Sequence, residues 1–179
     1  QGKGFIRQLV AQPRNGTFWV DEAFKSQGLD GDFLGAWGGW VVGNYAAADP
    51  RYGYEALKGR RVHAFSLRDL PVEEIEGQVS GRWGAQYVSF PMAGNIEIDL
   101  STGGQFQAWV YAWQGGQGQL QEMGLYETGH GVLFAEGVDS LTVMVGRTAA
   151  QGQSFLISAS YFIPTLVAGL EAVPAPLQL

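Results

Sequence analysis

The sequence has 179 residues, of which 46% are hydrophobic and 16% charged, and its formal net charge is −6. The hydrophobic fraction suffices for a core, and the charged fraction is too low for a disordered polyelectrolyte. The acidic balance excludes a general nucleic-acid-binding role, because no basic stripe is present to neutralise phosphates.

The first sixty residues have helical periodicity. One predicted helix covers residues 5–10 and ends before Pro13. A second is predicted from Thr17, a plausible N-cap, to a C-terminal stop at Gly28. These segments predict a small helical lobe over residues 1–60.

A third helix is predicted after Asp30 or Asp32 and should end near residues 44–48, because Asp49 precedes Pro50. Its large apolar residues have helical spacing, but glycines lie among them: Phe33, Trp37, Trp40, Val41 and Tyr45 alternate with Gly35, Gly38, Gly39 and Gly43. Each glycine costs up to about 1 kcal/mol of helix stability relative to alanine. We therefore expect this helix to be buried on more than one side, by more polypeptide than two short helices supply.

From residue 61 the period changes to that of β-strands. Residues 61–85 are expected to be an extended crossing segment, and the acidic run Glu73–Gly77 within it is expected to be solvated. Seven strands separated by glycine-rich turns are predicted: Gln86–Pro91, Asn95–Leu100, Phe106–Trp113, Leu120–Tyr126, Val132–Ala135, Ser140–Gly146 and Ser154–Phe162. The predicted fold class is α+β, with the helical lobe followed by an antiparallel β-sandwich of jelly-roll or immunoglobulin-like type over residues 86–163 and a tail over 164–179.

The strand with the sequence FQAWVYAW places Trp109, Tyr111 and Trp113 on one face. A row of aromatic rings can stack on sugar rings, so these three residues are candidates for carbohydrate binding. The favoured interpretation is that the strand is central. Its aromatic face then packs against the helical lobe or another domain.

Residues for catalysis or metal binding are sparse. The two histidines, His63 and His130, lie in different halves and do not form an H-E-x-x-H pattern. The chain has no cysteine and therefore no thiol nucleophile, and nothing in the spacing supports a serine triad built on His130 and Asp139. No phosphate-binding loop is present.

Carboxylates leave one further alternative open. Glu97 and Asp99 alternate on a predicted strand, and Glu136 and Asp139 are expected in a loop. A calcium ion bridging such segments would suit a secreted sandwich. A solvated strand face is favoured over this, because no D-x-D-x-D-G loop exists.

The helical region resembles the end of the catalytic domain in secreted bacterial zinc metallopeptidases of the immune inhibitor A-like and thermolysin-like (gluzincin) kind. The resemblance covers about residues 1–60. It is carried by Phe5, Leu9, Asn15, Gly16, Phe33, Trp37, Trp40, Asn44, Tyr45, Tyr52, Gly53 and Tyr54. In such enzymes these helices lie behind the zinc cleft, and a β-sandwich commonly follows.

The resemblance implies that this chain is the C-terminal portion of a peptidase-like protein, non-catalytic by itself. The zinc ligands of that family would precede Gln1, so zinc would belong to the parent enzyme and no catalytic residue is carried over. The implied partner is the N-terminal part of the same protein, and the sandwich would position a protein or glycan substrate or add stability. The alternative is a non-enzymatic carbohydrate- or protein-binding module of the cell envelope.

Localisation is inferred from composition. The 27 glycines and the start at Gln1 rather than Met suit a processed, extracellular or cell-envelope protein, or a piece of a longer one. The apolar run near the C-terminus is too short and interrupted to span a bilayer.

Overall fold

A computed structural model describes residues 17–53, 62–125, 128–149 and 154–164. The predicted helix over residues 5–10 and the tail beyond residue 164 lie outside these ranges. The helices are α2 (Thr17–Ser26) and α3 (Phe33–Tyr45). The strands are β1 (Phe65–Ser66), β2 (Val72–Gln78), β3 (Ala85–Phe90), β4 (Gly94–Thr102), β5 (Phe106–Gln114), β6 (Gln117–Met123), β7 (His130–Val138), β8 (Ser140–Arg147) and β9 (Ser154–Tyr161).

Both described helices begin and end where local chemistry requires it. Gly28, just after α2, has a φ of 62°, a left-handed conformation that glycine adopts at little cost. Asp32 is the N-cap of α3, and its carboxylate accepts a hydrogen bond from the Gly35 amide at 2.7 Å. Ala46 closes α3. The predicted start of α3 and the predicted ends of both helices are therefore confirmed, whereas Thr17, predicted as an N-cap, is itself the first residue of α2. Neither described helix is long and apolar enough to cross a membrane.

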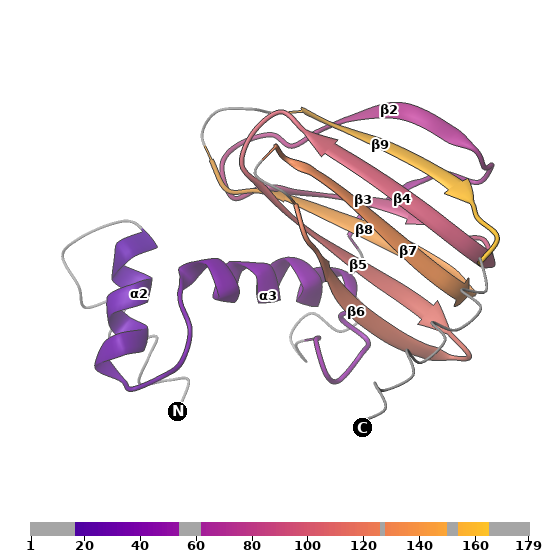
Figure 1. Cartoon of the computed structure of the whole chain (residues 1–179). Helices are drawn as coiled ribbons and strands as arrows, with labels where there is room; N and C mark the ends of the chain where they lie inside the picture. The colour runs from indigo at the N-terminus through magenta and orange to yellow at the C-terminus, as the bar shows by residue number, and fades with distance from the viewer. Residues whose placement is uncertain (1–16, 54–61, 126–127, 150–153, 165–179) are drawn as a thin grey trace, which may run out of the picture.

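The strands form two packed sheets with jelly-roll connectivity (Figure 1). The five-stranded sheet has the order β1-β3-β8-β5-β6, and the four-stranded sheet has the order β2-β9-β4-β7. Apart from the β5–β6 hairpin, each strand from β2 onward is followed by one in the opposite sheet. This arrangement is that of two Greek keys, so of the two predicted sandwich types the structure has the jelly roll.

Alternation along the strands decides which face is buried. Ile96, Ile98 and Leu100 of β4 and Leu141 and Val143 of β8 point into the space between the sheets, where they are fully or almost fully buried. The β5–β6 hairpin turns through Gly115 and Gly116, both with positive φ, as a two-residue hairpin requires. The sequence therefore encodes both the inward faces and the tightest turn directly.

All seven predicted strands are present, with ends that shift by a few residues. Two further strands lie in the segment that was expected only to cross over. The glutamates of the run Glu73–Gly77 are solvated, as expected, but the run also belongs to edge strand β2, paired with β9, which the sequence did not predict. Its glutamates are exposed, while the ring of Phe155 lies over Gly77 where a side chain would collide. Glu136, expected in a loop, lies in β7.

Helix α3 packs on the outer face of the five-stranded sheet and forms a second hydrophobic core there (Figure 1). Trp37 and Val41 of α3 meet Tyr87, Trp109 and Met144 of the sheet. The surface that covers one side of this helix is therefore the chain's own sandwich. On this side, the polypeptide that α3 was expected to need beyond the helices is supplied by the five-stranded sheet of the same chain.

Glycines on both surfaces allow this close packing. A Cβ at Gly38 of α3 would lie 2.8 Å from the Trp109 ring, and a Cβ at Gly146 of β8 would collide with the Trp37 ring. Each tryptophan thus occupies space that a glycine of the opposite surface leaves free. The aromatic burial, about 25 cal/mol per Å² of apolar area, offsets the helix cost of the glycines.

We predict that Gly38→Ala lowers the free energy of unfolding by about 1–3 kcal/mol, although alanine is the better helix former. The added methyl displaces the Trp109 indole from a closely packed site. Chemical denaturation of wild type and variant measures the effect. Gly35→Ala is the control, because its added Cβ would meet only the capping Asp32 carboxylate. If Gly38→Ala were stabilising, the proposed packing would be wrong.

Candidate binding site beside helix α3

Hydrogen bonds across the interface position α3 on the sheet. The Tyr87 hydroxyl donates to the Val41 carbonyl at 3.0 Å, and the Thr142 hydroxyl donates to the Tyr45 hydroxyl at 2.6 Å. The Trp37 indole N–H donates to the carbonyl of Trp83 at 3.0 Å. These bonds satisfy polar groups that the apolar packing would otherwise bury without partners.

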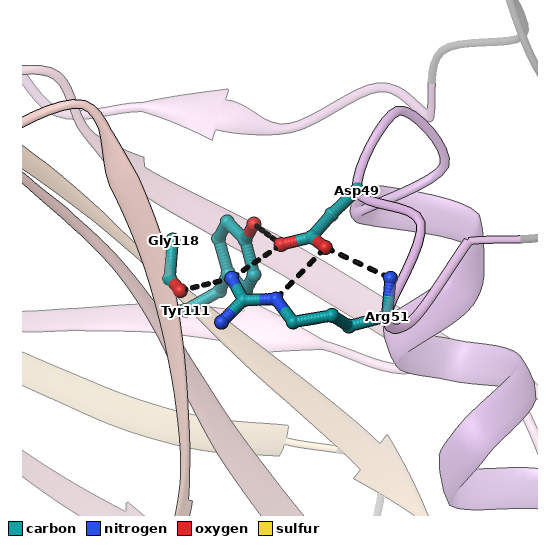
Figure 2. Close-up of polar contacts among 4 residues, drawn as sticks. All are labelled: Asp49, Arg51, Tyr111 and Gly118. Atoms are coloured by element: carbon teal, nitrogen blue, oxygen red, sulfur yellow. Dashed lines mark hydrogen bonds and ion pairs between the residues drawn. The ribbon is translucent and has the colours of Figure 1, made fainter.

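The turn after α3 is held to β5 and β6 by Asp49, Arg51 and Tyr111 (Figure 2). Arg51 binds the Asp49 carboxylate through both Nε, at 3.0 Å, and Nη2, at 2.7 Å, a bidentate geometry. The Tyr111 hydroxyl donates to the same carboxylate at 2.7 Å, and Arg51 also donates to the Gly118 carbonyl. The cluster therefore joins the end of α3 to two adjacent strands.

This arrangement shifts the ionisation of its members. The hydrogen bonds from Arg51 hold the pKa of the nearly buried Asp49 well below its usual range, despite burial of the carboxyl. Burial, together with the hydrogen bond to Asp49, raises the pKa of Tyr111 above its ordinary value. Burial also raises the pKa of Tyr87 to about 12. Asp49 is consequently a carboxylate and both tyrosines are neutral at physiological pH.

Two hollows flank this cluster. The larger, about 470 Å³, lies between α3 and strands β5 and β6. The smaller, about 370 Å³, lies on the side of Tyr45, Tyr111 and Trp113. Both have volumes in the range of small-ligand sites.

The structure separates the three residues predicted to form an aromatic platform. Trp109 is 7% exposed and Tyr111 is 1% exposed, because α3 and the turn after it cover them. Trp113, at the end of β5, is 39% exposed and packs edge-on against Tyr111 with ring centroids 5.7 Å apart. The central-strand interpretation thus describes Trp109 and Tyr111, and only Trp113 remains accessible to a large ligand.

Four of the twelve residues that carry the peptidase resemblance lie at the helix–sheet interface. Phe33 and Trp37 pack edge-on against Trp83, with ring centroids 4.5 and 5.4 Å away. Tyr45 and Tyr52 both contact the Tyr111 ring. Asn44 is half-buried near Tyr87, and Trp40 is exposed. Gly53 follows a turn, at a position where a Cβ would collide with the backbone. The remaining residues of the resemblance lie outside the described part of the chain: Phe5, Leu9, Asn15, Gly16 and Tyr54.

The other candidate residues lie elsewhere. On the outer face of the four-stranded sheet, His130 Nε2 lies 3.0 Å from Asp99 Oδ1. Glu97 lines a hollow on the same face. His63 lies just before β1. Within the described ranges, no three histidine or carboxylate side chains gather into a group that could hold a metal ion.

Sequence reasoning missed the polar residues of the site. Asp49 was treated only as the end of a helix, and Arg51, Gln107 and Glu122 were not singled out. A local signal existed for Asp49 and Arg51, because D-P-R after a helix places an acid and a base two residues apart in a tight turn. No local pattern could identify Gln107 and Glu122, which become neighbours of α3 only through tertiary packing.

Comparison of this chain with known proteins finds a likeness among solved structures. No protein-family model matches it, and no curated protein matches it. Among solved structures, it is similar to the crystal structure of the pre-peptidase C-terminal domain of a collagenase from Bacillus anthracis. The two are 15% identical, the match covers 57% of this chain and 99% of that chain, and the TM-score is 0.43. At that score the likeness carries no inference about function.

We predict that acid unfolding depends on Asp49. Its folded-state pKa lies below the ordinary value of 3.8, so its stabilisation is complete above about pH 5 and is lost as the pH falls through the folded-state pKa. Asp49→Asn should therefore be less stable than wild type at pH 7 and should lose less stability between about pH 5 and pH 2.

Urea denaturation at several pH values measures how the free energy of unfolding changes with pH in wild type and in Asp49→Asn. The exposed Asp30→Asn is the control and should follow the wild-type slope. Parallel curves for wild type and Asp49→Asn would contradict the predicted coupling between Asp49 and Arg51.

Proposed function

We propose that this chain is a non-catalytic accessory module of a larger, secreted, peptidase-like protein. In this role the helices hold the jelly roll against the peptidase part, and the catalytic zinc would be bound by residues outside this chain. The resemblance of residues 1–60 to the end of a peptidase domain supports the proposal.

The observation that carries the proposal is the apolar surface that the helices leave uncovered. Phe18 of α2 is 58% exposed, Leu29 is 40% exposed and Trp40 of α3 is 49% exposed. Helix α2 buries only Trp19 and Ala23 among its own residues. It lies beside the start of α3 rather than on either sheet (Figure 1). Such large exposed apolar side chains on poorly buried helices are typical of surfaces that bind further protein.

The gene provides the first test. We expect the coding sequence upstream of Gln1 to encode a helix with the H-E-x-x-H pattern and a downstream glutamate ligand. Sequencing the complete reading frame decides this. A frame in which no zinc-ligand pattern precedes Gln1 would contradict the peptidase proposal.

Substitution of the exposed aromatic residues provides the second test. In the full-length protein, Phe18→Ser and Trp40→Ser should lower the melting temperature and expose the junction to proteolysis, because both rings would be covered there. In the isolated chain the same variants should melt within about 2 °C of wild type, since a loss of less than about 0.5 kcal/mol is expected at exposed positions.

The matched control is Phe134→Ser. Phe134 is 57% exposed on β7, in the other sheet, and should have the same small effect in both proteins. If all three variants behave alike in the full-length protein, the helices are not the docking surface.

The geometry also supports a second candidate function, carbohydrate binding at the smaller hollow. The accessible indole of Trp113 lies there with Tyr45 and the Tyr111–Asp49 pair, and an aromatic ring beside polar groups suits a sugar. We expect Trp113→Ala to abolish retention on an insoluble polysaccharide that holds the wild type in a pull-down. Trp40→Ala is the control, and equal retention of both variants would remove this candidate.

A further inference from the structure

The larger hollow, here called the slot, has one wall formed by α3 and is lined by both apolar and polar residues. Leu34 of α3 and Leu120 of β6 lie on opposite sides, and the Trp109 indole contributes to the lining. Gly35 and Gly39 line it from the helix, and without side chains they leave its volume unfilled. A slot of this kind accommodates an unbranched aliphatic chain laid against an aromatic surface.

The charge within the slot is unbalanced. Arg51 reaches the slot, but its guanidinium is bound by the Asp49 carboxylate, so the pair has no net charge. Glu122 lines the same slot and has no ion-pair partner among the residues that the structure describes. Glu122 is also paired in register with Trp109, two residues along β6 from Leu120. The slot therefore combines an apolar interior with one uncompensated carboxylate.

Gln107 adds a further polar group to the slot. It lines the slot from β5, and its Oε1 is buried with no hydrogen-bond partner among the described residues. Because no bond holds this oxygen, the amide can turn and present it to a donor in the slot without losing an interaction. A buried acceptor without a partner favours a ligand that supplies an N–H group.

We propose that this slot binds the side chain of a lysine or arginine residue in a peptide. The aliphatic stem lies against Trp109 and the two leucines, the cation approaches the Glu122 carboxylate, and the N–H groups donate to Gln107 Oε1. The indole face adds a favourable interaction with the cation. Charge complementarity selects this occupant, because a neutral chain would leave Glu122 and Gln107 without partners. The inference goes beyond the accessory role and does not depend on it.

Three capped peptides test the ligand chemistry on the wild-type chain. Ac-Gly-Lys-Gly-NH2 should bind, Ac-Gly-norleucine-Gly-NH2 should bind at least threefold more weakly, and Ac-Gly-Glu-Gly-NH2 should not bind. Titrations followed by 1H–15N NMR should show the largest shift changes at the Trp109 indole N–H and at Gln107. Equal binding of the lysine and norleucine peptides would overturn the proposal. So would the absence of any shift change up to 10 mM lysine peptide, which is roughly the highest dissociation constant expected for such a small ligand.

Substitutions at Glu122 test the site itself. Glu122→Gln should weaken the lysine peptide about three- to fivefold, the range expected for an exposed ion pair, and raising the salt concentration should narrow the difference. Glu136→Gln is the matched control, because it removes the same charge from an exposed position on β7. If the two variants bind the peptide equally, Glu122 does not contact the cation.

Free N-acetyl-lysine methylamide distinguishes recognition of one side chain from recognition of a longer peptide. If the slot recognises the side chain alone, N-acetyl-lysine methylamide should bind as tightly as the lysine tripeptide. Loss of its binding would show that the chain recognises the flanking peptide backbone, and this would overturn the proposal. Melting curves confirm that each variant is folded before its affinity is compared.

Discussion

Mutual packing of tryptophan rings and glycines between α3 and the five-stranded sheet is the contact on which the helical part of the molecule depends. Trp37 fits over Gly146, and Trp109 fits over Gly38, so neither surface could carry a methyl group at these positions without displacing an indole. The helix and the sheet each contribute one tryptophan ring and one glycine to this contact. Protein interiors are packed densely enough that such complementarity fixes a single arrangement.

The polar groups of the interface follow from that contact. Once α3 lies across the sheet, the turn after it reaches β5, and Asp49 meets the Tyr111 hydroxyl. Arg51 then neutralises the carboxylate and reaches the backbone of β6. Gly118 is required at that point, because a Cβ there would collide with the Tyr111 hydroxyl. One buried carboxylate thus connects a helix terminus, a central strand and an edge strand.

The same packing produces the features that suit binding. The glycines of α3 leave the slot unfilled between the helix and strands β5 and β6. These strands contribute Gln107 and Glu122 to the lining of the slot. On its opposite side α3 exposes Trp40. The helix therefore has one face packed on the jelly roll and a large apolar side chain, Trp40, exposed elsewhere on its surface.

The sequence by itself determined the local elements. Asp32 and Gly28 mark helix ends, alternating residues such as Ile96, Ile98 and Leu100 mark inward strand faces, and the Gly115–Gly116 pair marks the hairpin, because each signal acts within a few residues. The tertiary structure alone decided that β2 is part of the sandwich, since its glutamates conceal a strand whose one fully buried residue is Gly77, under Phe155. Val72 and Ile75 of β2 pack on the core while only partly buried. It also decided that Trp109 and Tyr111 are covered while Trp113 is not, and that Glu122 and Gln107 meet beside α3. Those outcomes depend on which distant surfaces meet, and residues more than fifty positions apart carry no mutual signal in a single sequence.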